Sequence, residues 1–124
     1  RIYKDLNEIN SQNELEKFII SLEDRFGSMP KEAKDLIESM KIKWLGTELG
    51  LGKIILKSGK MILHFNENKG NEPHENIIST FLKKIQESPS RYRMKQTNRL
   101  SIIIESVKSV HDAFITLQEI KNPE

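Results

Sequence analysis

The apolar residues of this chain change their spacing near residue 50. Up to Leu49 they recur every three or four residues, which is the period of an amphipathic helix. Beyond Gly52 they first come in short runs typical of strands, and helical spacing returns later. The pattern therefore predicts a helical first part followed by a mixture of strands and helices.

Two helices are predicted before the first glycine. A short amphipathic helix covers Arg1 to Ile9. The second begins at Ser11, which forms a capping box with Glu14, and ends at Gly27, whose missing Cβ suits a left-handed stop. The apolar face of this second helix carries Leu15, Phe18, Ile19, Leu22 and Phe26.

A third helix and a hairpin follow. The helix runs from Pro30 to Leu49 and stops at Gly50. Its apolar face carries Ala33, Leu36, Ile37, Met40, Trp44 and Leu45. Next, two short apolar runs are separated by two turn-forming residues, which predicts a β-hairpin. The runs are Lys53 to Lys57 and Lys60 to Phe65, and the turn is Ser58-Gly59.

The remaining residues predict two more helices and a second hairpin. A fourth helix is expected from Pro73 to Glu87, strands over Arg91 to Lys95 and Arg99 to Glu105, and a last helix from Ser109 with Asp112 in the capping position. The fourth helix should bury Ile78, Phe81, Leu82 and Ile85, and the last should bury Val110, Ala113, Phe114 and Leu117.

These elements predict an α+β fold. About five helices and two β-hairpins should form a small, mainly antiparallel four-stranded sheet, in the order ααα-ββ-α-ββ-α. The 124 residues are enough for one domain over 1–124 and include no Cys, so folding should need neither disulfides nor metal. Because a helical pattern is already under way at Arg1, we expect a segment of a larger protein. No apolar run is long enough for a membrane span, and we expect a cytoplasmic location.

Candidate catalytic chemistry is sparse. The chain has no Gly-rich phosphate loop with a Lys and a Ser or Thr, and Gly50-Leu51-Gly52 is interpreted as a helix end followed by a strand start. His64, His74 and His111 lack the spacing of a metal site. Adjacent acids such as Glu23-Asp24 point in different directions on a helix. We therefore expect no enzyme activity, metal or cofactor in this domain.

The net charge of +2 conceals an uneven distribution. The strand regions are basic, whereas the segments with the first, second and last helices are net acidic. The strand residues expected to face the helices are Met61, Leu63, Phe65, Tyr92, Met94, Leu100, Ile102 and Ile104. The opposite sheet face should then show an aliphatic strip of Ile55, Ile62 and Ile103 with a basic rim of Lys53, Lys57, Lys60, His64, Arg91, Arg93, Lys95 and Arg99.

Three interpretations of this basic sheet face are open. It can be an ordinary solvated face whose cations guard the sheet edges, or a docking surface for an acidic partner or a neighbouring domain. It can also belong to a nucleic-acid-binding accessory domain. Single-stranded RNA is disfavoured, because the strand aromatics Phe65 and Tyr92 lie in the inward register.

Asp24 is unusual for its position. It lies in the last turn of the second helix, where the helix dipole disfavours a carboxylate and favours a cation such as Arg25. Asp24 can pair locally with Arg25, Lys31 or Lys34, or it can serve a partner.

Several short motifs in this chain occur in the order and spacing of one known family. They are Arg1-Ile2-Tyr3-Lys4 with Leu6, Asn13-Glu14-Leu15, Asp24-Arg25-Phe26-Gly27 with Met29-Pro30, Leu36-Ile37, Lys41, Leu49-Gly50-Leu51, Ile54 and Phe65. In these motifs the chain resembles the C-terminal domain of the bacterial transcription-repair coupling factors, the Mfd family. The resemblance covers nearly the whole chain and is strongest over residues 1–65.

The resemblance implies a non-catalytic regulatory module at the C-terminus of a multidomain protein. In the family, a helicase-like motor that uses ATP and Mg translocates on duplex DNA and releases stalled RNA polymerase, and an N-terminal module recruits UvrA. The C-terminal domain packs on that N-terminal module and covers its UvrA-binding surface until the protein engages stalled polymerase. It thus acts as an autoinhibitory clamp.

The resemblance also implies which residues make this interdomain contact. The family's contact surface includes the end of the helix that bears Asp-Arg-Phe-Gly, which corresponds to Asp24 and Arg25 in this chain. One turn earlier, where relatives can have an acid, this chain has Ser21, so its polar contact is expected to be thinner.

Overall fold

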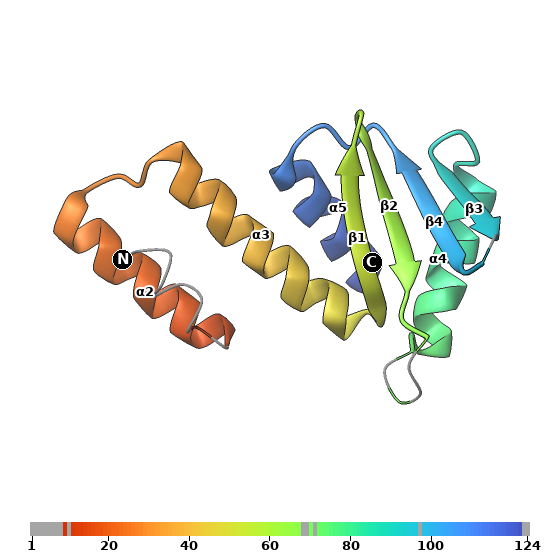
Figure 1. Ribbon diagram of the computed structural model, residues 1–124, viewed down its shortest axis with the longest axis horizontal. Coiled ribbons are helices and arrows are strands. Elements are labelled where there is room, and N and C mark those ends of the chain that lie inside the picture. The colour runs from red at the N-terminus through yellow and green to blue at the C-terminus, as the bar shows by residue number, and fades with distance from the viewer. Residues whose placement is uncertain (1–8, 10, 68–69, 71, 97, 123–124) are drawn as a thin grey trace.

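The computed structural model describes residues 9, 11–67, 70, 72–96 and 98–122, which contain four helices and four strands (Figure 1). The helices are α2 (Gln12–Phe26), α3 (Lys31–Glu48), α4 (Glu75–Glu87) and α5 (Val110–Lys121), and the strands are β1 (Leu51–Lys57), β2 (Lys60–Phe65), β3 (Tyr92–Gln96) and β4 (Leu100–Glu105). The predicted α+β class and the element order from the second helix onward are confirmed. The helix predicted over Arg1 to Ile9 lies outside the described residues except for Ile9.

The four strands form one antiparallel sheet in the order β1-β2-β4-β3. Each predicted hairpin is present, and the pairing of β2 with β4 joins the two. Ser58 and Gly59 both have positive φ, 54° and 76°, which matches the turn that suits the twist of a two-residue hairpin. Strands β1 and β3 are therefore the sheet edges.

The main core lies between one face of the sheet, here called the inner face, and the helices. Figure 1 shows α4 and α5 behind the sheet. Met61, Leu63, Ile102 and Ile104 are fully buried on the inner face, and helix residues including Phe81 and Leu117 pack on them. The inward register predicted for the strands is confirmed. Met94 shares this register but stays 40% exposed, because it lies on the edge strand β3.

A second, smaller core joins α2 to α3. Leu15 of α2 and Ile37 of α3 are buried in it, and Phe18, Met40 and Trp44 are among the half-buried residues around them. Further along α3, the buried residues Ile42 and Leu45 belong to the main core instead, as does Leu49 just after the helix. Helix α3 therefore has two buried sides, one for each core, and the single apolar face predicted for it omitted Ile42.

The predicted faces of α4 and α5 need correction. In α4 the structure buries Ile77 and Phe81 and leaves Leu82 45% exposed, because the ring of Phe81 packs edge-on against Phe65 with centroids 5.6 Å apart. The doublets Ile77-Ile78 and Phe81-Leu82 allow two overlapping apolar faces. In α5 the buried residues are Ala113, Thr116, Leu117 and Ile120, whereas Val110 and Phe114 are half-buried.

The N-cap of α2 is the predicted residue, Ser11, whereas the N-cap of α5 is Ser109 and not Asp112. Ser11 Oγ accepts from the Glu14 amide at 3.1 Å, as predicted. In α5 the cap is Ser109, whose Oγ accepts from the Asp112 amide at 3.0 Å. Asp112 lies three residues into the helix and its carboxylate accepts from the Lys108 amide at 3.3 Å. The prediction that placed Asp112 at the cap was wrong by these three residues.

Gly50 fixes the turn from α3 into β1. Its φ is +79°, which a residue with a Cβ resists. A Cβ at this position would also lie 2.9 Å from the carbonyl carbon of Glu72, and nearer still to the backbone of Pro73. The segment before α4 thus packs directly on the end of α3. No helix among the described residues is long and apolar enough to cross a membrane.

We predict that Gly50→Ala destabilises the fold more than Gly59→Ala. Both glycines have positive φ, so each substitution should cost about 1 kcal/mol of backbone strain. Only Gly50 has backbone atoms in the way of a Cβ, since nothing lies within 4 Å at Gly59. That clash should add roughly 1–3 kcal/mol. Urea unfolding of both variants measures the difference, and equal losses would contradict the packing of Pro73 on Gly50.

Candidate functional site

The C-terminal end of α2 carries the three residues predicted for an interdomain contact. Ser21, Asp24 and Arg25 are all exposed, whereas Leu22 between them is buried. Asp24 and Arg25 follow Ser21 by three and four residues, so each of them neighbours Ser21 on the helix surface. The structure thus brings these three residues together on one solvent-exposed surface.

Asp24 has no ion-pair or hydrogen-bond partner among the described side chains. The Arg25 guanidinium instead lies over the Phe26 ring, 5.3 Å from its centroid. Lys31 pairs with Asp35 of its own helix, Nζ to Oδ2 at 3.9 Å, and Lys34 makes no ion pair with Asp24. The local pairing that was one interpretation of Asp24 is therefore not formed, and its carboxylate stays exposed where the helix dipole disfavours it.

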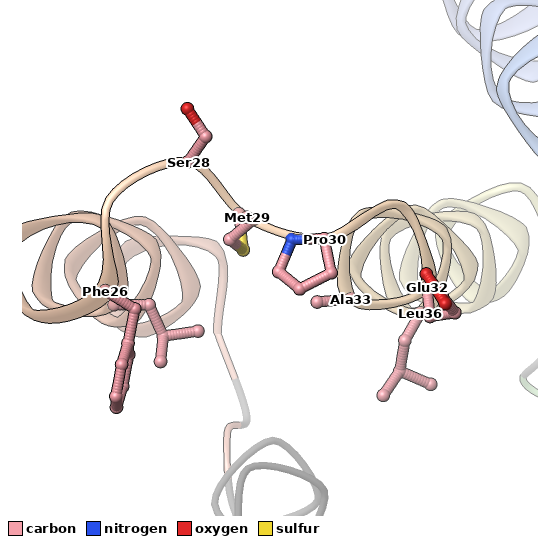
Figure 2. A pocket seen from close by; sticks show the side chains of 8 residues that line it. Phe26, Ser28, Met29, Pro30, Glu32, Ala33 and Leu36 are labelled. Carbon is pink, nitrogen blue, oxygen red and sulfur yellow. The ribbon is translucent and has the colours of Figure 1, made fainter.

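Phe26 next to this surface is 63% exposed, although the sequence pattern placed it on the buried face of α2. Phe26 is the last residue of the helix and the chain turns away at Gly27, so its ring is left largely uncovered. The ring lines a groove of about 480 Å³ between the end of α2 and the start of α3. Figure 2 shows Phe26 and Leu36 on its two sides, with Met29 and Pro30 between them.

The second candidate surface is the sheet face opposite the helices, here called the outer face. The strand registers place its side chains in three rows that run across the strands. The apolar row contains Ile55, Ile62 and Ile103, with Arg93 next to Ile103. The basic row contains Lys53, His64, Ser101 and Lys95, and the mixed row contains Lys57, Lys60 and Glu105. Arg99 precedes β4 in the same outward register.

Arg91 does not belong to this basic face, contrary to the prediction. Its Nε donates to the carbonyl oxygen of Glu105 at 3.2 Å, and its Nη2 donates to Thr116 Oγ1 of α5 at 3.4 Å. Its guanidinium also lies 5.6 Å from the centroid of the Tyr92 ring. Arg91 lies before the start of β3, so its side chain can turn toward the helices. It joins the sheet edge to α5.

Glu105 is a residue of the outer face that sequence reasoning missed. Its carboxylate pairs with Arg93 and, at 3.8 Å, with Lys60. Glu105 lies two residues after Ile103 and four after Ser101, so strand alternation places it on the outer face with them. Sequence reasoning noted it only as a single acid among cations and did not predict its ion pairs. The mixed row is therefore partly neutralised, while the basic row contains no carboxylate.

His64 in the basic row is half-buried, and its Nδ1 lies 2.7 Å from Ser101 Oγ. Burial, together with the nearby charges of Arg99 and Lys53, lowers the pKa of this imidazole below its ordinary value. At neutral pH it is therefore mainly uncharged. The charge of the basic row comes from Lys53 and Lys95, and Arg99 adds a further cation close to it.

The walls of the groove at the α2 end are mostly apolar side chains, with Glu32 as the one acid that lines it among the described residues. Within the same described part of the chain, no three His, Asp or Glu side chains converge as a metal site requires.

A family model described as the TRCF domain matches residues 1–76, which is more than half of the chain. The chain belongs to the TRCF domain family. The match covers the part of the chain in which the sequence resemblance was strongest, and the proposed family is confirmed. The candidate contact residues Ser21, Asp24 and Arg25 lie inside the matched TRCF region, whereas β3 and β4 lie beyond it.

Two curated relatives are similar to this TRCF domain. The transcription-repair-coupling factor of Escherichia coli (strain K12) is 27% identical over 101 residues, and that of Rickettsia bellii (strain RML369-C) is 26% identical over 102 residues. Each match covers 82% of this chain, but only 8% and 9% of the respective relative. The chain therefore spans less than a tenth of the length of these relatives.

A solved structure has a similar fold. The crystal structure of the C-terminal domain of transcription-repair coupling factor aligns over 99% of this chain and 80% of that chain, with a TM-score of 0.68 and 18% sequence identity. The likeness of fold thus extends past the residues matched by the family model, into the second hairpin and α5.

We predict that His64 titrates below the value of about 6.5 that is usual for histidine. Because the folded state disfavours its proton, this group should lower the stability of the fold as the pH falls from 6.5 through its folded pKa. Arg99→Gln should move the titration upward, since it removes one of the nearby cations, while Lys31→Gln on α3 should not. NMR titration of the assigned imidazole resonances measures both effects. A midpoint at or above 6.5 would contradict the crowding of His64 by cations.

Proposed function

We propose that this chain is a non-catalytic regulatory module of a transcription-repair coupling factor. In this proposal the exposed end of α2 docks on the N-terminal UvrA-binding module of the same protein and keeps UvrA away until the protein engages stalled RNA polymerase. ATP hydrolysis with Mg and movement on duplex DNA belong to a motor elsewhere in the parent protein. Membership of the TRCF family supports the assignment to a transcription-repair coupling factor. One structural observation supports the end of α2 as the docking surface.

That observation is the exposed carboxylate of Asp24. It lies in the last turn of α2, where the dipole disfavours it, and no described side chain pairs with it. An arginine on a partner module would compensate both the dipole and the missing partner through a charge-assisted hydrogen bond. The carboxylate thus slightly lowers the stability of this domain by itself, and it would stabilise the docked state.

The neighbours of Asp24 suit a contact that must open. Ser21 adds an uncharged hydroxyl, and Arg25 adds a cation held over the exposed Phe26 ring. Contacts between domains of one chain are usually moderate in area and more polar than permanent interfaces. Since the inhibited state has to be released, the docked state should be favoured by only a few kcal/mol.

The proposal predicts that Asp24→Arg raises the affinity of the intact protein for UvrA. Charge reversal would place two cations against each other and weaken the docked state, so the UvrA-binding module would be uncovered more often. We expect an increase of several-fold, which corresponds to about 1 kcal/mol. Titration of UvrA against the full-length protein, followed by calorimetry or fluorescence anisotropy, measures it.

Glu16→Arg is the matched control. It makes the same charge change at an exposed position of the same helix, away from its C-terminal end, and should leave UvrA affinity unchanged. Asp24→Arg should not unfold the chain, because a cation near a helix C-terminus is favourable by a few tenths of a kcal/mol. Unaltered UvrA affinity in a folded Asp24→Arg protein would refute Asp24 as a contact. If deletion of this chain also left UvrA affinity unaltered, the clamp itself would be refuted.

A further inference from the structure

The outer face of the sheet is a surface that the proposed function does not use. Figure 1 shows no described helix or strand in front of it, while α4 and α5 lie behind. It is built by β1, β2, β3 and β4, whereas Asp24 and Arg25 lie at the end of α2. Binding at this face would therefore be independent of the docking of α2.

The apolar row gives this face a hydrophobic centre. Ile55 is the register partner of Ile62, and Ile62 is the register partner of Ile103, so the three side chains are nearest neighbours on three adjacent strands. All three are half-buried although no described helix covers them. Neighbouring strands are about 4.8 Å apart, so the row is roughly 10 Å long. Its length equals about two turns of an α-helix.

The two rows that flank this centre differ in charge. On one side the basic row has Lys53 and Lys95 at its ends, and Arg99 close enough to His64 to disfavour its proton. On the other side Glu105 pairs with Lys60 and Arg93. Among the described side chains, Glu105 thus offsets part of the positive charge on that side, where Lys57 stays unpaired, while the basic row has no carboxylate to offset Lys53 and Lys95.

We propose that the outer face docks an acidic amphipathic segment of a protein partner. Apolar side chains of the segment would cover Ile55, Ile62 and Ile103, and its carboxylates would pair with the basic row. A helix with apolar positions i, i+4 and i+7 matches the length of the apolar row. Acidic residues beside that stripe would then face Lys53, Lys95 and Arg99. The basic row would select a partner with carboxylates, and the apolar row would select one that also carries an apolar stripe.

Nucleic acid fits this face less well than an acidic protein segment. The outward strand residues named above are aliphatic, basic or polar, and no aromatic ring among them offers bases a stacking surface. The carboxylate of Glu105 would repel a phosphate backbone that crossed all three rows. Arg91, a natural phosphate ligand by its charge, is turned toward Thr116. An isoleucine row gains by covering with apolar side chains, which a phosphate backbone does not supply.

The probe for this proposal is a synthetic helix-forming peptide of about 18 residues. It carries leucines at positions i, i+4 and i+7 and glutamates on both sides, and a second peptide has glutamine in place of every glutamate. Titrated into the isotopically labelled 124-residue chain, the acidic peptide should shift the NMR signals of Ile55, Ile62 and Ile103. The glutamine peptide should bind at least several-fold more weakly.

Substitutions in the protein then test the two parts of the surface. Lys53→Glu with Lys95→Glu should weaken binding of the acidic peptide about tenfold or more. The control pair Lys17→Glu with Lys34→Glu makes the same charge change on exposed helix positions and should leave the affinity within about twofold. Ile55→Thr, which keeps a β-branched side chain on the edge strand, should weaken binding several-fold without unfolding the sheet.

Three outcomes would overturn the proposal. The acidic peptide could fail to bind, or both lysine pairs could change its affinity equally, which would indicate only a general attraction of charges. A random duplex of about 20 base pairs could instead bind more tightly than the peptide, with steep salt dependence that Lys53→Glu with Lys95→Glu removes. That last result would assign the face to nucleic acid.

Discussion

Helix α3 is the element on which the arrangement of this domain depends, because it is buried on two sides. Ile37 packs with Leu15 of α2, and further along the helix Ile42 and Leu45 pack in the core under the sheet. A hydrogen bond between Glu38 and His111 and an ion pair between Glu48 and Lys121 fasten the same helix to α5. The orientation of α2 relative to the sheet is thus set through one continuous helix.

This construction explains how a small domain can present two surfaces of opposite character. The C-terminal end of α2 contributes no residue to the main core. Asp24 and Phe26 can therefore be exposed there at little cost to that core. The helices among the described residues cover one face of the sheet, so cations can line the other. The net charge of +2 is the sum of these parts and describes neither surface.

Local chemistry explains which cations are available for binding. Arg91 donates hydrogen bonds to the Glu105 carbonyl oxygen and to Thr116. Arg93 and Lys60 both pair with the Glu105 carboxylate. His64 is kept mainly neutral by burial and by its cationic neighbours. Lys53 and Lys95 have no such partners among the described side chains. Fewer cations of the outer face are therefore available for binding than its number of basic residues suggests.

The sequence alone determined the elements, their order, the cap at Ser11, and the turn at Ser58-Gly59, because these depend on residues close together in the chain. It also determined which strand residues share a face, since side chains alternate along a strand. Only the tertiary structure decided the double burial of α3, the choice of Ile77 over Ile78, and the inward turn of Arg91. Each of these depends on a partner distant in sequence, such as Leu15 for Ile37, Phe65 for Phe81, and Thr116 for Arg91. A periodic pattern records that a residue needs burial or a charge needs a partner, but the packing of distant segments decides which partner it meets.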